Sequence, residues 1–420
     1  LNSWFPRSGG ACFDTGLHAL TNFVPPEASG APLNRILRQL RIRRGDLNLL
    51  PQSTSAIQFP GCSLLLNNDF QAFRAQIEEL FPGEVQAFAR LLERIEAAGY
   101  SGEAPDGQSA RGVMTECGIG RRLQDMLAMP VMYYGNTMPG DMVFGDFATM
   151  FKSVVREGFA RPAGGMKAFL RVLTDKLEAN GGVLALGNGI SSLEVSGGRV
   201  TGAVDSRGER HTASHFISTV GALESAVLLG EAAPPLLKKA RPGEMGFVEA
   251  LVELKAPPAA LGFPHCVAFV NLPERFEFAP PSAPGELPES VLICAPGNYQ
   301  GSDESSLLRI SAITRTEWWF GCAEDEYRAR KAAAAEKCLE FLGRYDSRLA
   351  ADARCIDFFT PRTIKRFTGH ADGVLYGSPD KLRDFRSGLE NLTIAGTDQG
   401  LLGIVGAMLS GILAANLTLS

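Results

Sequence analysis

The stretch that decides the fold is residues 392–407, LTIAGTDQGLLGIVGA. Its first four residues, LTIA, predict a short buried strand, which Gly396 and the polar turn TDQG then end. A helix is predicted after the turn, because apolar residues recur there at spacings of three and four positions. These residues are Val405, Met408, Leu409, Ile412 and Leu413. The stretch therefore predicts a strand, a glycine-rich turn and a helix in direct succession.

The residue types in this stretch also favour a bound cofactor. A second side of the helix, at Gly403, Ala407 and Gly411, has almost no side chain, so a large flat group could approach the backbone. The first N–H groups of a helix lack partners within it and favour negative charge in front of them. Asp398 places a carboxylate in the turn, where it either holds a polyol or phosphate-linked group or caps the helix that follows.

A C-terminal membrane anchor is the alternative interpretation, since no charged residue follows Asp398. The apolar part, residues 401–415, is shorter than the ~20 residues that cross a bilayer. Five glycines between Gly396 and Gly411 also argue against an anchor. Both observations favour the cofactor interpretation.

The overall composition is typical of a soluble globular protein, with 45% hydrophobic residues, 21% charged residues and a net charge of −5. A chain of 420 residues is long enough for two domains with sizeable cores. Basic residues are interspersed with acidic ones, so no nucleic-acid partner is predicted. Residues 33–44, LNRILRQLRIRR, predict an amphipathic helix whose arginines either face water or bind a membrane surface peripherally.

The eight cysteines show no CxxC pair and no histidine at metal-ligand spacing, so no metal site is predicted. Apolar surroundings, as at Cys294 and Cys338, predict buried free thiols in a reducing compartment. The expected location is therefore cytoplasmic, with peripheral membrane contact as an option. Five histidines form no Ser/His/Asp or Cys/His set, which favours chemistry carried out by a cofactor.

Residues 396–407, GTDQGLLGIVGA, resemble the C-terminal flavin motif of the phytoene desaturase, carotenoid isomerase and retinol saturase family. These are FAD enzymes related in fold to monoamine oxidases. The resemblance implies that Gly396 and Asp398 contact the ribityl–pyrophosphate part of FAD. It also implies that the helix start at Leu402, Gly403 and Ile404 lies against the isoalloxazine ring.

The N-terminal residues resemble the same family in part. The family carries a serine after a Gly-Gly-Arg element and then a Phe-Asp-x-Gly segment that passes the flavin, which Ser3 and residues 13–16 match. By this resemblance Ser3, Gly16, Leu17 and His18 lie near FAD. The catalytic residue is unknown, and His18 is the one titratable candidate. The family's opening GxGxxG turn does not occur in the chain. We therefore expect an FAD domain that lacks its first βαβ unit and binds FAD poorly by itself.

Between these ends, amphipathic helices are predicted over residues 32–100. The Met- and aromatic-rich stretch 121–151 is either ordinary core or the lining of a long apolar cavity. A helix ending at Gly181-Gly182, a strand over 183–186 and a hairpin at Gly197-Gly198 follow.

Three further residues in the middle of the chain are assigned to FAD by the resemblance alone. Ile190 would touch the adenine side, and Thr219 and Val220, at the end of a buried strand, would pass near the pyrophosphate. Ordinary sheet core is the alternative for each of them.

Four strands are predicted over residues 247–254, 266–272, 291–295 and 307–314, and they suggest an antiparallel sheet before a charged helix over 324–345. The predicted fold class is α/β (α+β), with a split Rossmann-like FAD-binding domain truncated at its N-terminus. An antiparallel-sheet substrate domain and a helical cap complete it. The FAD domain is assigned residues 1–30, 155–240 and 385–420, and the substrate domain residues 31–154 and 241–384.

The predicted function is that of an FAD-dependent oxidoreductase acting on a long apolar polyene or isoprenoid. The reaction would be desaturation, saturation or isomerisation of a carotenoid or retinoid. Two alternatives stay open. A flavin amine oxidase should show an aromatic pair beside the flavin, and a cofactor-free isoprenoid-binding protein would need no flavin.

Overall fold

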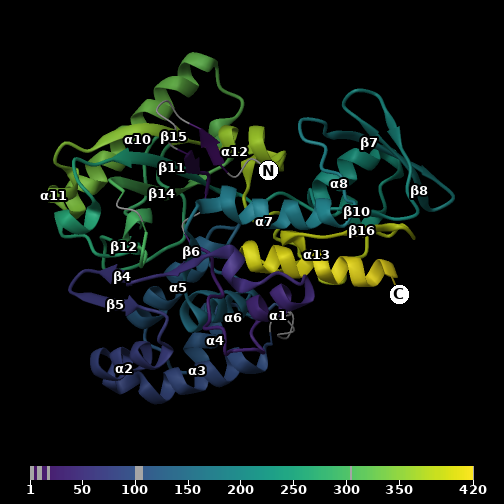
Figure 1. The fold of residues 1–420 in the computed structure, drawn as a ribbon. Coiled ribbons are helices and arrows are strands. Elements are labelled where there is room, and N and C mark those ends of the chain that lie inside the picture. Colours follow the sequence, from purple (N-terminus) through teal and green to yellow (C-terminus); the bar gives the residue numbers. More distant parts are fainter. Residues whose placement is uncertain (1–3, 7–11, 17–18, 100–106, 303–304, 420) are drawn as a thin grey trace.

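The structure, a computed structural model, describes residues 4–6, 12–16, 19–99, 107–302 and 305–419. Figure 1 shows three parts: a large sheet covered by helix α10, a cluster of helices α2–α6, and a smaller α/β part with the C-terminal helix α13. The chain is thus a mixed α/β protein, as predicted.

The large sheet has seven strands in the order β15-β11-β14-β13-β12-β4-β5. Its neighbours pair antiparallel, except that β12 and β4 run parallel. The four strands expected between residues 247 and 314 are those at its centre. The bounds are β4 Ser55–Phe59, β5 Cys62–Leu66, β11 Met245–Glu253, β12 Val267–Asn271, β13 Ser290–Cys294, β14 Leu307–Arg315 and β15 Arg354–Phe359.

Both faces of the central strands are covered, because successive side chains of a strand point to opposite faces. Phe247 and Phe269 pack on the helical cluster. Val248 and Val270 pack on the opposite side, against α10 (Glu324–Tyr345). This double burial is why the strands read as nearly continuous apolar runs in the sequence.

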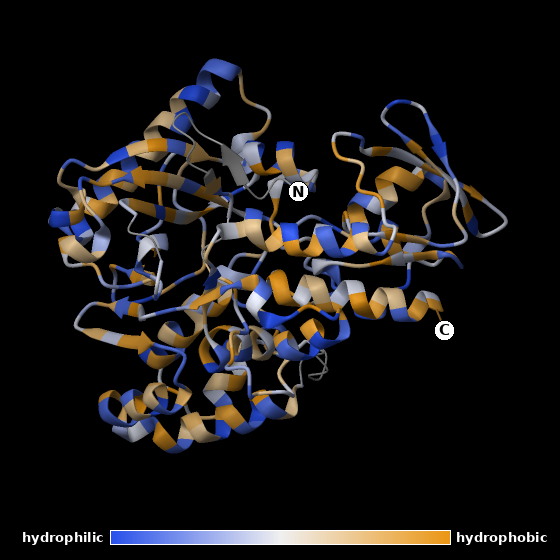
Figure 2. Ribbon diagram, in the orientation of Figure 1, coloured by the Kyte–Doolittle hydropathy of each residue, from blue (hydrophilic) through white to orange (hydrophobic). Residues whose placement is uncertain are grey.

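The helical cluster contains the Met- and aromatic-rich stretch. Its buried side chains include Met126, Met129, Met132, Phe147 and Phe151, each 0% exposed. They form packed core, which is one of the two interpretations of the stretch. Figure 2 shows hydrophilic and hydrophobic residues alternating along the outer helices α2 and α3. The bounds are α2 Phe70–Leu80, α3 Val85–Ala97, α4 Ala110–Glu116, α5 Arg121–Gly135 and α6 Phe144–Phe151, which continues as a π-helical turn, Lys152–Glu157.

Residues 32–100 are not helical throughout, so that prediction is wrong in part. After α1 (Pro32–Gln39) come β3 (Leu49–Pro51), β4 and β5. The strands β4 and β5 form a hairpin at Gly61, whose φ of 66° suits the turn, and β4 joins the large sheet through β12. Pairing with a strand more than two hundred residues away overrides the local helical pattern.

The smaller α/β part contains a parallel strand pair, β10–β16, and a three-stranded antiparallel sheet, β7-β8-β9. Apolar residues of α1, such as Leu33 and Ile36, pack with Val405 and Ile412 of α13. The bounds are α7 Gly165–Ala179, β7 Ile190–Ser196, β8 Arg199–Asp205, β9 Arg210–His211, β10 Phe216–Ser218, α8 Ala222–Leu229, β16 Leu392–Ile394 and α13 Gly403–Leu419.

Residues 183–186, predicted as a strand, form a loop. Val183 is 90% exposed and Leu186 is 61% exposed. None of the strands that the structure describes pairs with this segment. A strand needs a hydrogen-bonded neighbour, so an apolar sequence without one does not form it.

The remaining elements connect these parts. Two short pairs are β1 (Trp4–Pro6) with β2 (Cys12–Asp14) and β3 with β6 (Ala160–Pro162). Short helices are α9 Pro235–Lys238, α11 Ser347–Ala350 and α12 Pro361–Thr368. The cysteines whose side chains are described are free thiols. None of the helices in the described ranges is long and apolar enough to cross a bilayer.

Candidate functional site

The loops that follow β10 and β16 meet at the carboxyl ends of these parallel strands. The Ala395 N–H donates to Ser218 O at 2.8 Å, which locks the two loops side by side. Gly221 and Gly396 have φ values of 112° and 104°, which only glycine adopts easily. A Cβ atom on Gly396 would lie 3.6 Å from Thr219 O. The carboxyl ends of parallel strands are where α/β folds bind ligands.

The structure therefore brings together four of the residues assigned to FAD: Thr219, Val220, Gly396 and Asp398. The last of these is held in a way that the sequence did not indicate. Asp398 is 1% exposed, and its two carboxylate oxygens accept the N–H groups of Ala222 at 2.6 Å and Ser378 at 2.8 Å.

Asp398 thus caps α8, which starts at Ala222, and not the helix that follows it in the sequence. It also fixes the turn at Gly377, where a Cβ atom would lie 2.0 Å from Asp398 Oδ1. The carboxylate is a cross-link between three chain segments that surround the loops. Its direct contact with FAD stays a prediction.

Further charged groups surround Asp398, and sequence reasoning missed all of them. Glu224, in the first turn of α8, accepts the Ala371 N–H at 2.7 Å and lies 3.4 Å from His370 Nδ1. The Glu224 carboxylate raises the pKa of His370. Burial opposes ionisation of Glu224, but the adjacent His370 ring and the hydrogen bond from the Ala371 N–H still hold its pKa below the usual range. Lys381 donates to Tyr376 O at 2.7 Å.

Burial lowers the pKa of Lys381, which the Asp398 and Asp146 carboxylates partly offset. Asp146 itself pairs with Arg383 at 2.9 Å. Three groups with shifted pKa values, Glu224, His370 and Lys381, therefore converge beside the two loops. Such clusters are typical of functional sites, although structural ion pairs produce them too.

The helix start assigned to the flavin ring packs directly on the Met- and aromatic-rich core. Leu402 is 4% exposed and belongs to that core. A Cβ atom on Gly135, at the end of α5, would lie 2.8 Å from Leu402 Cδ1. Gly403 has a φ of 73°, and α13, with Ile404 as its second residue, begins there. The Gly396 N–H donates to Ser410 Oγ of α13 at 2.6 Å, which ties the turn to the helix.

Two buried polar groups beside Gly135 lack a partner within the described chain: Tyr134 Oη and Asn136 Nδ2. The Tyr134 ring stacks on Phe159 with 5.6 Å between centroids, and burial raises the pKa of its hydroxyl well above the ordinary value. A buried polar group without a hydrogen bond is costly, so these two atoms are candidates for contact with a ligand. No motif in the sequence marked them.

The other assigned residues are not all at this point. Ile190 is the first residue of β7 in the separate three-stranded sheet and is 42% exposed. Gly16 is exposed, has a φ of 69° and has open space where a Cβ atom would be. Ser3, Leu17 and His18 lie outside the described residues.

The fold is shared with solved structures over almost the whole chain. An oxidoreductase from Methanosarcina mazei matches with a TM-score of 0.66 at 14% identity, covering 99% of this chain and 91% of that chain. A triple mutant of a putrescine oxidase with redesigned cofactor binding gives 0.60 at 14% identity, covering 99% and 90%. A candidate protoporphyrinogen oxidase from Exiguobacterium sp. 255-15 gives 0.53 at 13% identity, covering 100% and 90%. No family profile and no curated protein matches the sequence. At these identities the likeness establishes a common fold.

Proposed function

We propose that this chain is an FAD-dependent oxidoreductase. The observation that carries the proposal is the pair of glycine loops at the carboxyl ends of β10 and β16, directly in front of α13. The likeness in fold to an oxidoreductase and a putrescine oxidase over 99% of the chain supports it. FAD would supply the redox chemistry, and the protein would position the substrate and exclude water.

The residues present fit one part of FAD. Gly396, Thr219 and Val220 would hold the ribityl–pyrophosphate through backbone groups, and Leu402, Gly403 and Ile404 would lie beside the ring. Asp398 would act by fixing these loops. The unpartnered Tyr134 Oη and Asn136 Nδ2 are available for a polar edge of the ring or of a substrate.

We propose further that the rest of the pyrophosphate is held by a βαβ unit that residues 1–420 do not contain. No described strand pairs with the outer edge of β10, and Ile217 on that strand is 44% exposed. The apolar loop 183–186 is unpaired as well. Parallel sheets normally have both faces covered, so an added βαβ unit would cover the exposed side of β10.

The proposed substrate is a long apolar polyene or isoprenoid, because Leu402 adjoins a core rich in Met and aromatic side chains. Membrane association during its uptake is part of this proposal. The apolar side of α1 packs on α13 and is not available to a membrane. Contact with the membrane surface would therefore involve the exposed arginines of α1, Arg35 and Arg38. An amine substrate is the second candidate, and it rests on the likeness to putrescine oxidase.

A flavin titration tests the proposal. Purified residues 1–420 and a chain extended upstream would each be titrated with FAD, with quenching of flavin fluorescence as the readout. We expect weak binding by the shorter chain and a yellow protein with about one FAD for the longer one. Tight binding by residues 1–420 would refute the proposal of an additional βαβ unit but not the proposed function. If neither chain binds FAD, the proposed function is wrong.

A matched pair of glycine variants distinguishes a specific effect of the Gly396 loop on FAD binding from the general effect of backbone strain. Gly396→Ala and Gly208→Ala both place a side chain at positive φ, 104° and 82°, but Gly208 lies in an open turn next to β9. Only Gly396→Ala should weaken FAD binding in the extended chain. The substrate class would follow from assays with a carotenoid in liposomes and with putrescine coupled to peroxide detection.

A further inference from the structure

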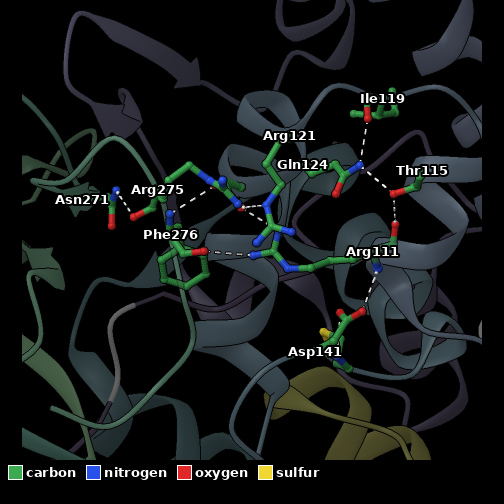
Figure 3. Close-up of polar contacts among 11 residues, drawn as sticks. Arg111, Thr115, Ile119, Arg121, Gln124, Asp141, Asn271, Arg275 and Phe276 are labelled. Atoms are coloured by element: carbon green, nitrogen blue, oxygen red, sulfur yellow. Dashed lines mark hydrogen bonds and ion pairs between the residues drawn. The ribbon is translucent and has the colours of Figure 1, made fainter. Parts of the chain in front are cut away.

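A buried carboxylate gathers three arginines at the N-terminal end of α5. Asp125 is 0% exposed, and its Oδ1 lies 2.6 Å from Arg111 Nη1 and 3.2 Å from Arg121 Nε. Its Oδ2 lies 2.8 Å from Arg275 Nε and accepts the Phe276 N–H at 3.2 Å. Figure 3 shows the arginine side chains converging from α4, from α5 and from the loop that carries Phe276.

The surroundings hold this arrangement in place. Arg111 Nη2 donates to Phe276 O at 3.1 Å, which ties α4 to the loop. Gln124, the neighbour of Asp125, donates to Ile119 O at 2.8 Å and fixes the start of α5 (Figure 3). Asp141 accepts the backbone N–H of Arg111 and not its guanidinium. Three guanidinium groups are therefore fixed around one carboxylate.

The cluster has more positive charge than that carboxylate neutralises. Among the described residues, Asp125 is the only ion-pair partner of Arg121 and of Arg275. Each pairs with Asp125 through its Nε atom, and neither makes a hydrogen bond through its terminal amino groups within the described chain. The two side chains are 45% and 53% exposed, so water and solutes reach them. Neighbouring guanidinium groups repel one another unless an anion lies between them.

The cluster lies far from the proposed flavin loops. Its Arg121 is the first residue of α5, and Gly135, which adjoins Leu402, is the last. At a rise of ~1.5 Å per residue, the two ends of this helix are roughly 20 Å apart. Arg275 also lines a surface pocket of about 490 Å³ together with Glu277 and Glu286. Those acids repel an anion, so an anion would bind more favourably on the side of Arg275 that faces Arg121.

We propose that Arg121 and Arg275 form a binding site for an oxyanion, either a phosphate group or a carboxylate. Asp125 fixes the Nε edges of both guanidinium groups, and the free amino groups then donate to the oxygens of the ligand. Planar guanidinium groups suit such two-oxygen recognition. This site is separate from the proposed flavin site and does not depend on it.

The test measures the melting temperature of residues 1–420 with inorganic phosphate, with acetate and with sodium chloride at equal ionic strength. We expect phosphate or acetate to raise the melting temperature above the chloride reference, and the preferred anion identifies the ligand class. A dissociation constant from calorimetry should rise at least roughly tenfold in Arg121→Gln and in Arg275→Gln. Both residues are half-exposed, so the variants should fold.

Arg171→Gln is the matched control, because Arg171 is an exposed helical arginine with an i,i+4 partner, Asp175, and the same charge is lost. It should bind the anion as the unmodified chain does. If neither anion differs from chloride, or if the double variant Arg121→Gln/Arg275→Gln keeps the effect, the arginines are a solvated structural cluster and the proposal is wrong.

Discussion

The large sheet and the small β10–β16 pair differ in how completely the described chain covers them. Strands β11 to β14 of the large sheet are buried on both faces, by the helical cluster and by α10. The parallel pair has only two strands, and Ile217 of β10 and Val227 of the following helix are 44% and 74% exposed. Parallel strands are normally found buried on both faces.

This difference separates stability from function. The large sheet forms its own core from residues within the described ranges. Substitutions of its buried residues should therefore change the free energy of unfolding strongly. The small pair carries the candidate site but leaves apolar side chains in water. Its substitutions should change stability less and should change ligand binding more.

The largest effect is expected for Glu249→Ala in β11. Glu249 and Arg309 form an ion pair with side chains only 8% and 3% exposed, and Ser311 Oγ donates to the same carboxylate at 2.9 Å. Removing the carboxylate takes away a buried ion-pair partner of the Arg309 guanidinium, which typically costs about 3–5 kcal/mol. Urea unfolding followed by circular dichroism measures this cost. Glu253→Ala is the control, because Glu253, paired with Arg354, is 43% exposed and should cost at most ~1 kcal/mol.

The second test compares one isoleucine in each region. Ile310 in β14 is 0% exposed, so Ile310→Ala should destabilise the chain by about 2–5 kcal/mol. Ile217→Ala should cost roughly 0.5 kcal/mol or less, because that side chain is half in water. In a chain extended upstream the cost at Ile217 should rise if added strands cover it. An equal cost at both positions would remove the contrast between the regions.

Sequence reasoning succeeded where the structure depends on local pattern. The helix over 324–345 was predicted with its observed bounds, and the central strands were placed to within a few residues. It failed for β4 and β5, which depend on a distant partner, and for residues 183–186, which have the composition of a strand but no neighbour. Period and composition do not say whether a partner strand is present.

The positions of the candidate residues, though not their role, were predictable to the same extent. Glycines with an acid after a short strand marked Gly396 and Asp398, and the structure places Thr219 beside them. Glu224 and His370 were not predicted, because residues far apart in the sequence come together there only in the folded chain. The Glu224 contact with Ala371 spans 147 residues. The unpartnered polar groups of Tyr134 and Asn136 were not predicted for another reason, because they lie in or next to an apolar stretch whose composition is typical of core.

Asp398→Ala tests a residue that belongs to the small region but is buried like the large one. Two N–H groups, from Ala222 and Ser378, would lose their acceptor, and we expect a cost of about 1–3 kcal/mol. The free energy of unfolding of the apo chain and the FAD affinity of an extended chain would both be measured. Asp384→Ala is the control, because exposed Asp384 accepts one local N–H, from Arg386 at 3.1 Å. Loss of FAD affinity without loss of stability would mean that Asp398 contacts the cofactor directly.

The smallest effect is a pH dependence at the pair of Glu224 and His370. The pKa of His370 is raised above its ordinary 6.5, so its contribution to stability is complete below that value and is lost as the pH rises through the raised pKa. The pKa of Glu224 is lowered from 4.5, so its contribution is present above 4.5 and is lost as the pH falls through the lowered pKa. Asp398 favours the charged form of His370, and Lys381 opposes it.

The stability difference between the unmodified chain and His370→Gln should therefore be larger at about pH 6 than at about pH 9. In a Glu224→Gln background the effect of His370→Gln should depend less on pH, because only Asp398 then favours the charged ring. The double variant should lose less stability than the sum of the two single variants. A difference that stays constant with pH would show that the 3.4 Å contact carries no charge interaction.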